Sequence, residues 1–409
     1  MEPAAAKAAA EYLEKGCPPP DDEILLRSSA GISFLTDFLR DQYLKDYIPA
    51  GGSKIKFVTG RSGSGKTHFG RLIRKAAEDA GFLTVTFSAR DIWLHDFSIL
   101  YLEILRQCSL EHILKGCADQ IIREMGDAPS AIPEGQTYMD YLSDKGEADA
   151  ITRSSIREAL RTRFTRNPRL DNNFALCCSL LTGSILGHPV LEAANEALLL
   201  SWLYGDKSVK LSQLRALGLS PARITKFNAR NMLRSLCETV RLSGHAGIFV
   251  FADDLEILVN RAGSERVRYT KLRRDDTYES IRQLIDDIDS MRYLFFLFGF
   301  DRELADNESS GLKSYQALWM RIQNEVSGTR FNRFADILDL DALSDQIYTP
   351  EVMCEMAVKL SGILCEAGLP FHPLDEEKAL TLTDRARYGG LGLPILVNQY
   401  VVKGDGDDV

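Results

Sequence analysis

The stretch GRSGSGKTHFGRLIR, residues 60–74, directly follows the apolar run KIKFVT at residues 54–59. It fits the pattern G-x-x-x-x-G-K-[ST] at every defined position, from Gly60 to Thr67. The glycines let the backbone turn so that successive N–H groups point inward and can bind phosphate oxygens. The helix that follows adds the partial positive charge of its N-terminus. The stretch therefore predicts a strand, a phosphate-binding loop and a helix over residues 66–80.

The residues of this loop are predicted to bind ATP together with Mg²⁺. Lys66 can reach the β- and γ-phosphates, and the Thr67 hydroxyl can bind Mg²⁺. His68 comes directly after the loop, and we expect it to pack or hydrogen-bond locally rather than to catalyse. The predicted nucleotide-binding residues are Gly60, Arg61, Ser62, Gly63, Ser64, Gly65, Lys66, Thr67 and His68.

A triphosphate with bound magnesium needs a second anchor, and the stretch GIFVFADDLEIL at residues 247–258 offers one. An apolar strand there ends in acids. Asp253 is placed to hold Mg²⁺ together with Thr67. Asp254 or Glu256 could polarise an attacking water. The alternative is that these acids only face solvent at a strand end. The phosphate-binding loop elsewhere in the chain favours the first interpretation.

Composition and apolar runs define the fold class. The chain has 409 residues, 45% of them hydrophobic, and a net charge of −9. A protein that lies wholly on nucleic acid would usually be basic, so any DNA contact must use a local patch. Continuous apolar runs fit buried strands of a parallel sheet with both faces covered. Strands are expected at residues 54–60, 82–89, 247–254 and 293–300, with a weaker one within 335–343.

These strands alternate with helical patterns, which predicts an α/β protein with the parallel sheet of a P-loop NTPase. The block between the second and third strands is helical and is expected to be an insertion into the sheet fold. The predicted units are an N-terminal helical arm at 1–30, the phosphate-loop half of the core at 31–100, the helical insertion at 101–243, the second half of the core at 244–343, and a C-terminal helical lid with an acidic tail at 344–409.

Three further segments narrow the comparison with known families: TYESIRQLIDDID at 277–289, YLFFLFGFDREL at 293–304 and GLKSYQALWMRI at 311–322. With the loop and the acidic strand end, they resemble the AAA+/origin-recognition-like ATPases of bacterial phage defence, the BREX-type ATP-binding proteins of the BrxC/BrxD kind. The resemblance implies a cytoplasmic ATPase, not in a membrane, that assembles as a homo-oligomer or hetero-complex. A methyltransferase or another effector subunit would be its partner, with DNA as a further candidate.

The chain departs from this family at catalytic positions. Asp254 stands where relatives carry glutamate, and Phe300 stands where they carry a polar sensor of the γ-phosphate. Asp301 could partly replace that sensor. Ile395 stands where relatives carry a second sensor arginine. Binding positions are intact, so we expect tight nucleotide binding with slow hydrolysis. The alternatives are a nucleotide-gated scaffold that does not hydrolyse ATP, and a DNA loader or transposition-type regulator of the same fold.

Arginines elsewhere could serve the same site. Arg385 or Arg387 could substitute for the absent sensor arginine. Arg321 closes the segment SYQALWMRI, and the resemblance implies that an arginine there is presented to the nucleotide of a neighbouring subunit. The alternative for Arg321 is an exposed helix residue paired with a nearby acid.

Two basic runs are candidates for binding DNA. The run RVRYTKLRR at 266–274 follows the acidic strand end, and its candidate residues are Arg268, Lys271, Arg273 and Arg274. The other run lies at 153–169, where Arg153, Arg157 and Arg161 recur every four residues on one helical face. A solvated face is the alternative for the second run, and a loop neutralised by nearby acids is the alternative for the first.

Overall fold

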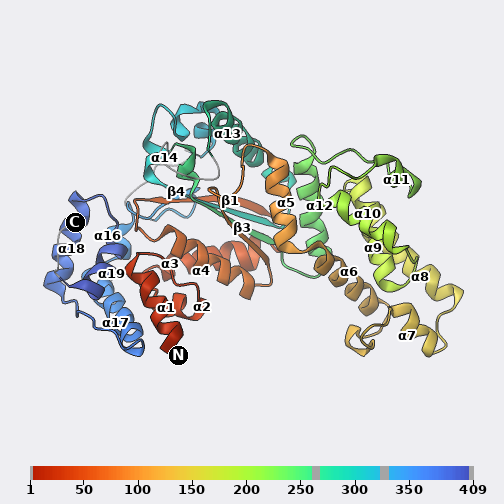
Figure 1. Ribbon diagram of the computed structural model, residues 1–409, viewed down its shortest axis with the longest axis horizontal. Coiled ribbons are helices and arrows are strands. Elements are labelled where there is room, and N and C mark those ends of the chain that lie inside the picture. The colour runs from red at the N-terminus through yellow and green to blue at the C-terminus, as the bar shows by residue number, and fades with distance from the viewer. Residues whose placement is uncertain (1–2, 260–267, 323–330, 405–409) are drawn as a thin grey trace.

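A five-stranded parallel sheet forms the centre of the molecule, a computed structural model that describes residues 3–259, 268–322 and 331–404 (Figure 1). All strands are parallel and lie in the order β2-β3-β4-β1-β5. Their bounds are β1 Ser53–Gly60, β2 Leu83–Ser88, β3 Ile248–Asp253, β4 Leu294–Asp301 and β5 Ile337–Asp339. The prediction of an α/β protein with a parallel sheet is confirmed.

Strand β4 shows why the strands are continuously apolar. It lies between β1 and β3, so both of its faces are covered. Leu294, Phe296 and Phe298 pack into one hydrophobic cluster, whereas Phe295 and Leu297 pack into another on the opposite face. Successive side chains of a strand point to opposite faces, so a strand buried on both sides needs apolar residues at every position.

Helix α4 (Lys66–Asp79) lies on one face of the sheet, next to α2 (Asp22–Ser28), α3 (Ser33–Leu39) and η1 (Arg40–Tyr47). Its apolar side packs Phe69, Leu72 and Ile73 into the same cluster as Phe251 of β3. Gly70 lets the helix approach closely, because a Cβ at this position would overlap the Phe251 ring. The close contact fixes how the phosphate-binding loop, at the start of this helix, sits on the sheet.

The chain leaves the sheet after β2 and returns at β3. Between them come α5 (Phe97–Cys108), α6 (Leu110–Glu124), η2 (Pro129–Ala131), α7 (Tyr138–Asp144), α8 (Ala150–Leu160), η3 (Arg161–Thr165), α9 (Asn172–Leu186), α10 (Ala193–Leu203), α11 (Leu211–Ala216) and α12 (Ala229–Leu242). Figure 1 shows α6 to α11 projecting away from the sheet, while α5 and α12 lie beside it.

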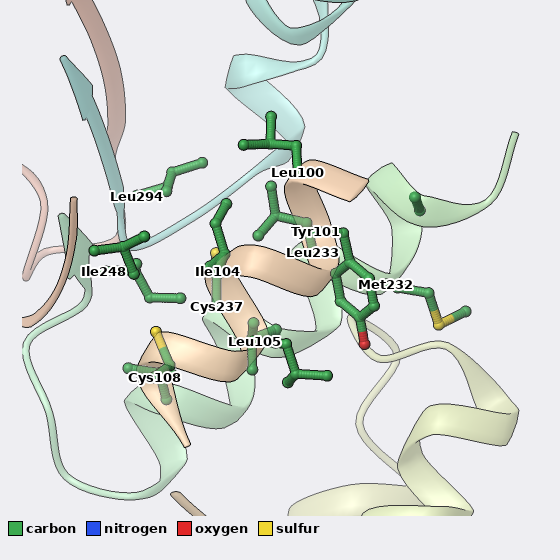
Figure 2. Close-up of a cluster of buried hydrophobic side chains, with 14 of the residues drawn as sticks. Leu100, Tyr101, Ile104, Leu105, Cys108, Met232, Leu233, Cys237, Ile248 and Leu294 are labelled. Carbon is green, nitrogen blue, oxygen red and sulfur yellow. The ribbon is translucent and has the colours of Figure 1, made fainter. Parts of the chain in front are cut away.

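Helices α5 and α12 attach this insertion to the sheet (Figure 2). Ile104 of α5 and Cys237 of α12 are fully buried and face the strand residues Ile248 and Leu294. The cluster continues without interruption from the strands into the helices of the insertion. The insertion therefore shares one hydrophobic core with the face of the sheet opposite α4.

The C-terminal helices form a separate group on the other side of the molecule (Figure 1). They are α16 (Ser344–Ile347), α17 (Pro350–Glu366), α18 (Glu376–Tyr388) and α19 (Leu393–Lys403), and α1 (Pro3–Glu14) packs against α17 and α19. The remaining elements are the long helix α13 (Lys271–Asp286) and the short elements η4 (Leu255–Leu258), η5 (Ile288–Ser290), α14 (Arg302–Asp306), η6 (Leu312–Ser314) and α15 (Gln316–Ile322). Among the helices of the described residues, none combines the length and apolarity needed to span a bilayer.

The close contact at Gly70 can be tested with a matched glycine. Gly70→Ala should lower thermal stability, because overpacking against Phe251 costs about 1–3 kcal/mol and outweighs the gain of about 1 kcal/mol in helix propensity. Gly362→Ala on α17 should raise stability, since a Cβ there meets no other atom within 4 Å. Thermal unfolding of both variants is the measurement. Equal shifts in the same direction would contradict the packing argument.

Candidate nucleotide-binding site

The phosphate-binding loop connects β1 to α4 and has the backbone shape that its glycines allow. Gly63 and Gly65 adopt φ angles of 75° and 94°, which other residues rarely adopt. The N–H of Ser64 donates to the carbonyl of Arg61 (3.1 Å), closing the turn. Gly65 is the N-terminal cap of α4, so the helix begins directly at the loop.

Lys66 lies in the centre of this loop. Its ammonium group donates to the carbonyls of Gly60 (3.1 Å) and Arg61 (2.9 Å) and forms an ion pair with Asp301 (2.5 Å). Strand β4 pairs with β1 so that Asp301 lies opposite Gly60, and this register brings the carboxylate to the lysine. The cationic group is held where a phosphate chain over the loop would meet it.

Thr67 and Asp253 form the second contact across the sheet edge. The Thr67 hydroxyl donates to a carboxylate oxygen of Asp253 (2.6 Å), and burial raises the pKa of Asp253 while this hydrogen bond lowers it. These are two hard oxygen ligands next to the loop, which fits Mg²⁺ held by few protein groups and by phosphates. Among the described residues, no group of three or more His, Cys, Asp and Glu side chains has a metal-binding arrangement.

Two partners restrain the side chain of Asp254. Its φ of 62° lies in the left-handed region, which is uncommon for a residue with a side chain. Ser88, the last residue of β2, donates its hydroxyl to Asp254 (2.6 Å). Arg90 lies 3.3 Å from the same carboxylate and also donates to Glu256 (2.9 Å). One arginine thus links both candidate catalytic acids.

Glu256 is the more deeply buried of these two acids. It lies in η4, and its second oxygen accepts a hydrogen bond from the N–H of Asp301 (3.1 Å). Burial and the neighbouring charges of Asp301 and Asp254 raise the pKa of Glu256 to about 7. A carboxyl group with this pKa exchanges its proton near neutral pH, which is a property suited to general acid–base chemistry.

Phe300 and Asp301, the last two residues of β4, have side chains in different surroundings. Phe300 is fully buried and packs 6.2 Å from the Phe57 ring, in the core on the insertion side of the sheet. Its side chain therefore has no place at the loop. Asp301 is the residue that reaches Lys66.

A cavity of about 590 Å³ opens over the loop. Its walls come from the loop, the sheet edge, the N-terminal arm and the C-terminal helices. The residues that line it include Tyr12, Leu13, Gly16, Cys17, Pro18, Ser29, Ile32, Ser62, Gly63, Gly65, Lys66, Thr67, His68, Arg71, Arg90, Asp253, Asp254, Glu256, Asp301, Tyr348, Met356, Leu360, Pro394, Ile395 and Asn398. The N-terminal arm and the C-terminal helices thus both contribute walls to this cavity.

The C-terminal helices touch the loop directly. The N–H of Gly392 donates to the carbonyl of Ser62 (3.0 Å), and a Cβ on Gly63 would overlap Ile395. The guanidinium of Arg61 donates to the carbonyls of Ala386 (2.7 Å) and Gly389 (2.8 Å) at the end of α18. Ile395, at the position of the absent arginine, therefore acts as an apolar contact on the loop.

His68 and Arg71 on α4 fix the N-terminal wall of the cavity. The ring of His68 hydrogen-bonds the Ser29 hydroxyl (2.7 Å), and burial lowers the pKa of His68 to about 4. Arg71 donates to three successive carbonyls, those of Pro18, Pro19 and Pro20. The local role expected for His68 agrees with this geometry.

Several predicted residues lie outside the cavity. Arg321 is half-exposed and pairs with Asp286, and Arg385 and Arg387 are exposed on α18. The structure therefore does not bring these arginines to the loop of their own chain. A role of Arg321 in a neighbouring subunit's site stays a prediction. The four basic residues between Arg268 and Arg274 also lie elsewhere, and Arg266 of that run lies outside the described residues.

Sequence reasoning missed Ser88, Arg90, Arg71 and Asn398. Ser88 and Arg90 had a usable signal, because polar residues at the end of a strand meet the other strand ends of a parallel sheet. Arg71 and Asn398 had none, since their positions depend on how the chain ends pack. Asn398 is buried, lines the cavity and has a carboxamide oxygen without a hydrogen-bond partner in the described part of the chain.

A parallel α/β sheet, a glycine loop at a helix N-terminus and an acid at the adjacent strand end are the features of a P-loop NTPase-like protein. Within that class the chain belongs to the family of BREX system ATP-binding proteins BrxC/D, which matches residues 31–367. Members of this family are ATP-binding components of BREX phage-defence systems. The predicted resemblance is confirmed.

Neither the curated proteins nor the solved structures contain a match to this chain.

The buried Glu256 predicts a pH-dependent stability in the nucleotide-free protein. Its pKa is higher in the folded chain, about 7, than its ordinary 4.5, so folding favours the protonated form and stability falls as pH rises through this window. Glu256→Gln should match the original at pH 5 and exceed it at pH 8, by about 2–3 kcal/mol. Thermal unfolding at both pH values measures this. Glu303→Gln, an exposed change, is the control, and a difference independent of pH would refute the assignment.

Proposed function

We propose that the chain is an AAA+-like ATPase that acts as a slow nucleotide-dependent switch in a cytoplasmic phage-defence complex. The observation that carries the proposal is the meeting of Lys66, Thr67, Asp253 and Asp301 at one sheet edge, under helices from the C-terminal end. The β1–β4 pairing supports the assignment to the AAA+ class. It brings the end of β4 beside the loop, which is where the resembling proteins carry a γ-phosphate sensor.

Each group at the edge has a part in binding ATP. The loop N–H groups and Lys66 bind the phosphates, and Lys66 exchanges its contact with Asp301 for the β- and γ-phosphates. Thr67 and Asp253 would hold Mg²⁺, which would offset phosphate charge when bound. The nucleoside lies in the part of the cavity between the loop and the chain ends. Closure of the C-terminal helices on the loop then depends on the nucleotide.

The proposed switch turns over slowly because its acids are already engaged. Asp254 is tied to Ser88 and Arg90, and Glu256 to Arg90 and the N–H of Asp301. These contacts hold both carboxylates in place, so that neither is free to turn toward an attacking water. No cationic sensor from α19 faces the loop, where Ile395 stands.

A scaffold that binds ATP without hydrolysis is the second candidate, and the apolar residues Phe300 and Ile395 at the two sensor positions favour it. Single-turnover hydrolysis separates the candidates. A product that forms in the original chain and not in Asp254→Asn supports the ATPase. Partner binding that follows ATP without any product supports the scaffold. In either case we propose assembly with other defence subunits or with further copies of this chain.

Binding through the loop can be tested with two lysines of one helix. Lys66→Ala should weaken ATP binding at least tenfold in calorimetry with Mg²⁺, because a charge-assisted phosphate contact of about 1.5–3 kcal/mol is lost. Lys75→Ala should leave binding unchanged, since Lys75 pairs with Asp79 outside the cavity. Equal affinities of the Lys66 variant and the original would sink the proposal.

The restraint on Asp254 predicts a variant with faster turnover. Ser88→Ala removes the hydrogen bond to Asp254 and the one that the Ser88 hydroxyl accepts from the N–H of Arg90 (3.1 Å). The first is typically worth about 0.5–1.5 kcal/mol, so its loss should raise the rate of phosphate release roughly two- to tenfold. Ser98→Ala, which alters only the start of α5, is the control. Turnover that is unchanged or slower in Ser88→Ala would mean that this hydrogen bond does not restrain the base.

A further inference from the structure

A basic and aromatic surface forms where the loop at residues 89–96 meets the start of α13. The rings of Trp93 and Tyr269 lie 5.5 Å apart. The Tyr269 hydroxyl accepts a hydrogen bond from the N–H of Leu94 (2.8 Å) and donates to the carbonyl of Ile92 (3.3 Å). Arg273 places its guanidinium 4.3 Å from the centre of the Trp93 ring. The first turn of α13 is thereby fixed on this loop.

The start of α12 and the segment directly before it lie next to the same loop. Arg230 stands 5.5 Å over the ring of Phe97, at the start of α5, and 3.1 Å from Asp287. Figure 1 shows the starts of α5 and α12 at the same edge of the molecule. His95 lies near cations of both α13 and the segment before α12. Burial and the charge of Arg273 lower the pKa of His95, and the charge of Lys226 lowers it further.

The charges of this segment are unusually one-sided. Between Asp206 and Glu238 the chain has no acidic residue, although its net charge is −9. Its basic residues are Lys207, Lys210, Arg215, Arg223, Lys226, Arg230 and Arg234. The acids nearest to His95 are Asp96 and Asp276, and Asp96 is occupied as the cap of α5. Among the described residues, Arg230 is the only one of these seven with an ion pair, while Arg223 and Arg234 donate hydrogen bonds to neutral oxygens.

Three cations of the surface are exposed and lack a hydrogen bond or ion pair among the residues described, namely Lys226, Arg268 and Lys271. The side chain of Arg274 differs from them: it is half-buried with an unpartnered Nε, and it lies near Tyr278. We therefore leave Arg274 out of the surface. Of the four basic residues predicted to bind DNA, Arg268, Lys271 and Arg273 therefore belong to the surface.

An exposed aromatic ring completes the surface. Phe227 is 84% exposed, although phenylalanine is usually buried, and the ammonium of Lys226 lies 5.6 Å from its ring centre. An exposed ring next to unpaired cations suits a ligand that has both flat apolar faces and negative charges. Single-stranded nucleic acid has both, because its bases stack on aromatic side chains and its phosphates attract lysine and arginine.

We propose that single-stranded nucleic acid binds the surface formed by Trp93, Lys226, Phe227, Arg268, Lys271 and Arg273. Phosphates lie along Lys226, Arg268 and Lys271, and an unpaired base stacks on Phe227. The surface lies outside the ATP cavity, so this binding does not depend on the proposed ATPase function. Duplex DNA would meet the same cations without an unstacked base and would bind more weakly.

The cations are tested by charge reversal with a matched control. Fluorescence anisotropy of a labelled 30-nucleotide oligo(dT) measures affinity over a series of salt concentrations. The variant Lys226→Glu/Arg268→Glu/Lys271→Glu should bind at least tenfold more weakly, with a salt slope smaller by about 2. The variant Arg153→Glu/Arg157→Glu/Arg161→Glu carries the same charge change on α8 and η3, in the other basic run considered for DNA. These arginines are exposed and have no hydrogen bond or ion pair within the described part of the chain. As a solvated face without the aromatic surface, they should leave binding as in the original.

Two results would overturn this surface. One is an unchanged affinity and salt slope in the first variant, and the other is an equal loss in the second. ATP binding by calorimetry should be the same in all three proteins. This result keeps a failure of the surface distinct from a failure of the ATP site, and from misfolding.

The stacked base is tested by Phe227→Ala. Loss of one stacked base should weaken oligo(dT) binding by about fivefold or more without changing the salt slope. Binding of a 30-base-pair duplex should stay the same in this variant. Equal losses for the single strand and the duplex, or no loss for either, would refute the stacking role, and a labelled oligo(U) of equal length shows whether RNA serves as well as DNA.

Discussion

The parallel direction of all five strands is the constraint on which the rest of the structure depends. Parallel strands end at one edge, so residues far apart in sequence become neighbours there. Gly60, Ser88, Asp253 and Asp301 are the last residues of four strands; Gly60 pairs with Asp301, and Ser88 pairs with Asp253. The phosphate-binding loop, the acid for a metal ion and the groups around Asp254 thus follow from strand direction and order together.

Acids and cations are equally numerous around the cavity at this edge, and the engagement of the cations bears on what can bind. Asp253, Asp254, Glu256 and Asp301 line the cavity, together with the cations Lys15, Lys66, Arg71 and Arg90. Arg71 is occupied by the carbonyls of the N-terminal arm, and Arg90 by two of the acids. A triphosphate that enters this cavity would meet the loop N–H groups, Lys15, and Lys66 once its ion pair with Asp301 has opened. A divalent cation at Thr67 and Asp253 would supply the charge that the side chains lack.

The sequence predicted the parts of this site that depend on local pattern. The loop from Gly60 to Thr67 has its own spacing rule, and continuous apolar runs located β1, β3 and β4. Arg90 escaped notice because it belongs to a loop and acts only through the register between β2 and β3. Phe300 shows another limit: the pattern placed an apolar residue at the sensor position, but only the pleat of β4 shows that its side chain points into the core. The cavity walls that come from the N-terminal arm and the C-terminal helices could not be predicted, because they depend on packing between residues hundreds of positions apart.

The contact between Ile395 and Gly63 is apolar, so the start of α19 would respond to the shape of the loop and not to the charge of a nucleotide. An arginine at the start of α19 would attract the γ-phosphate and would distinguish ATP from ADP by charge. Ile395 instead packs on the loop backbone, and the N–H of Gly392 donates to the carbonyl of Ser62. In the proposed switch, discrimination between ATP and ADP would then rest on Lys66 and Asp301, whose ion pair would have to open for the γ-phosphate. One loop, residues 89–96, joins this edge to the basic surface, since Arg90 enters the cavity while Trp93 packs against α13.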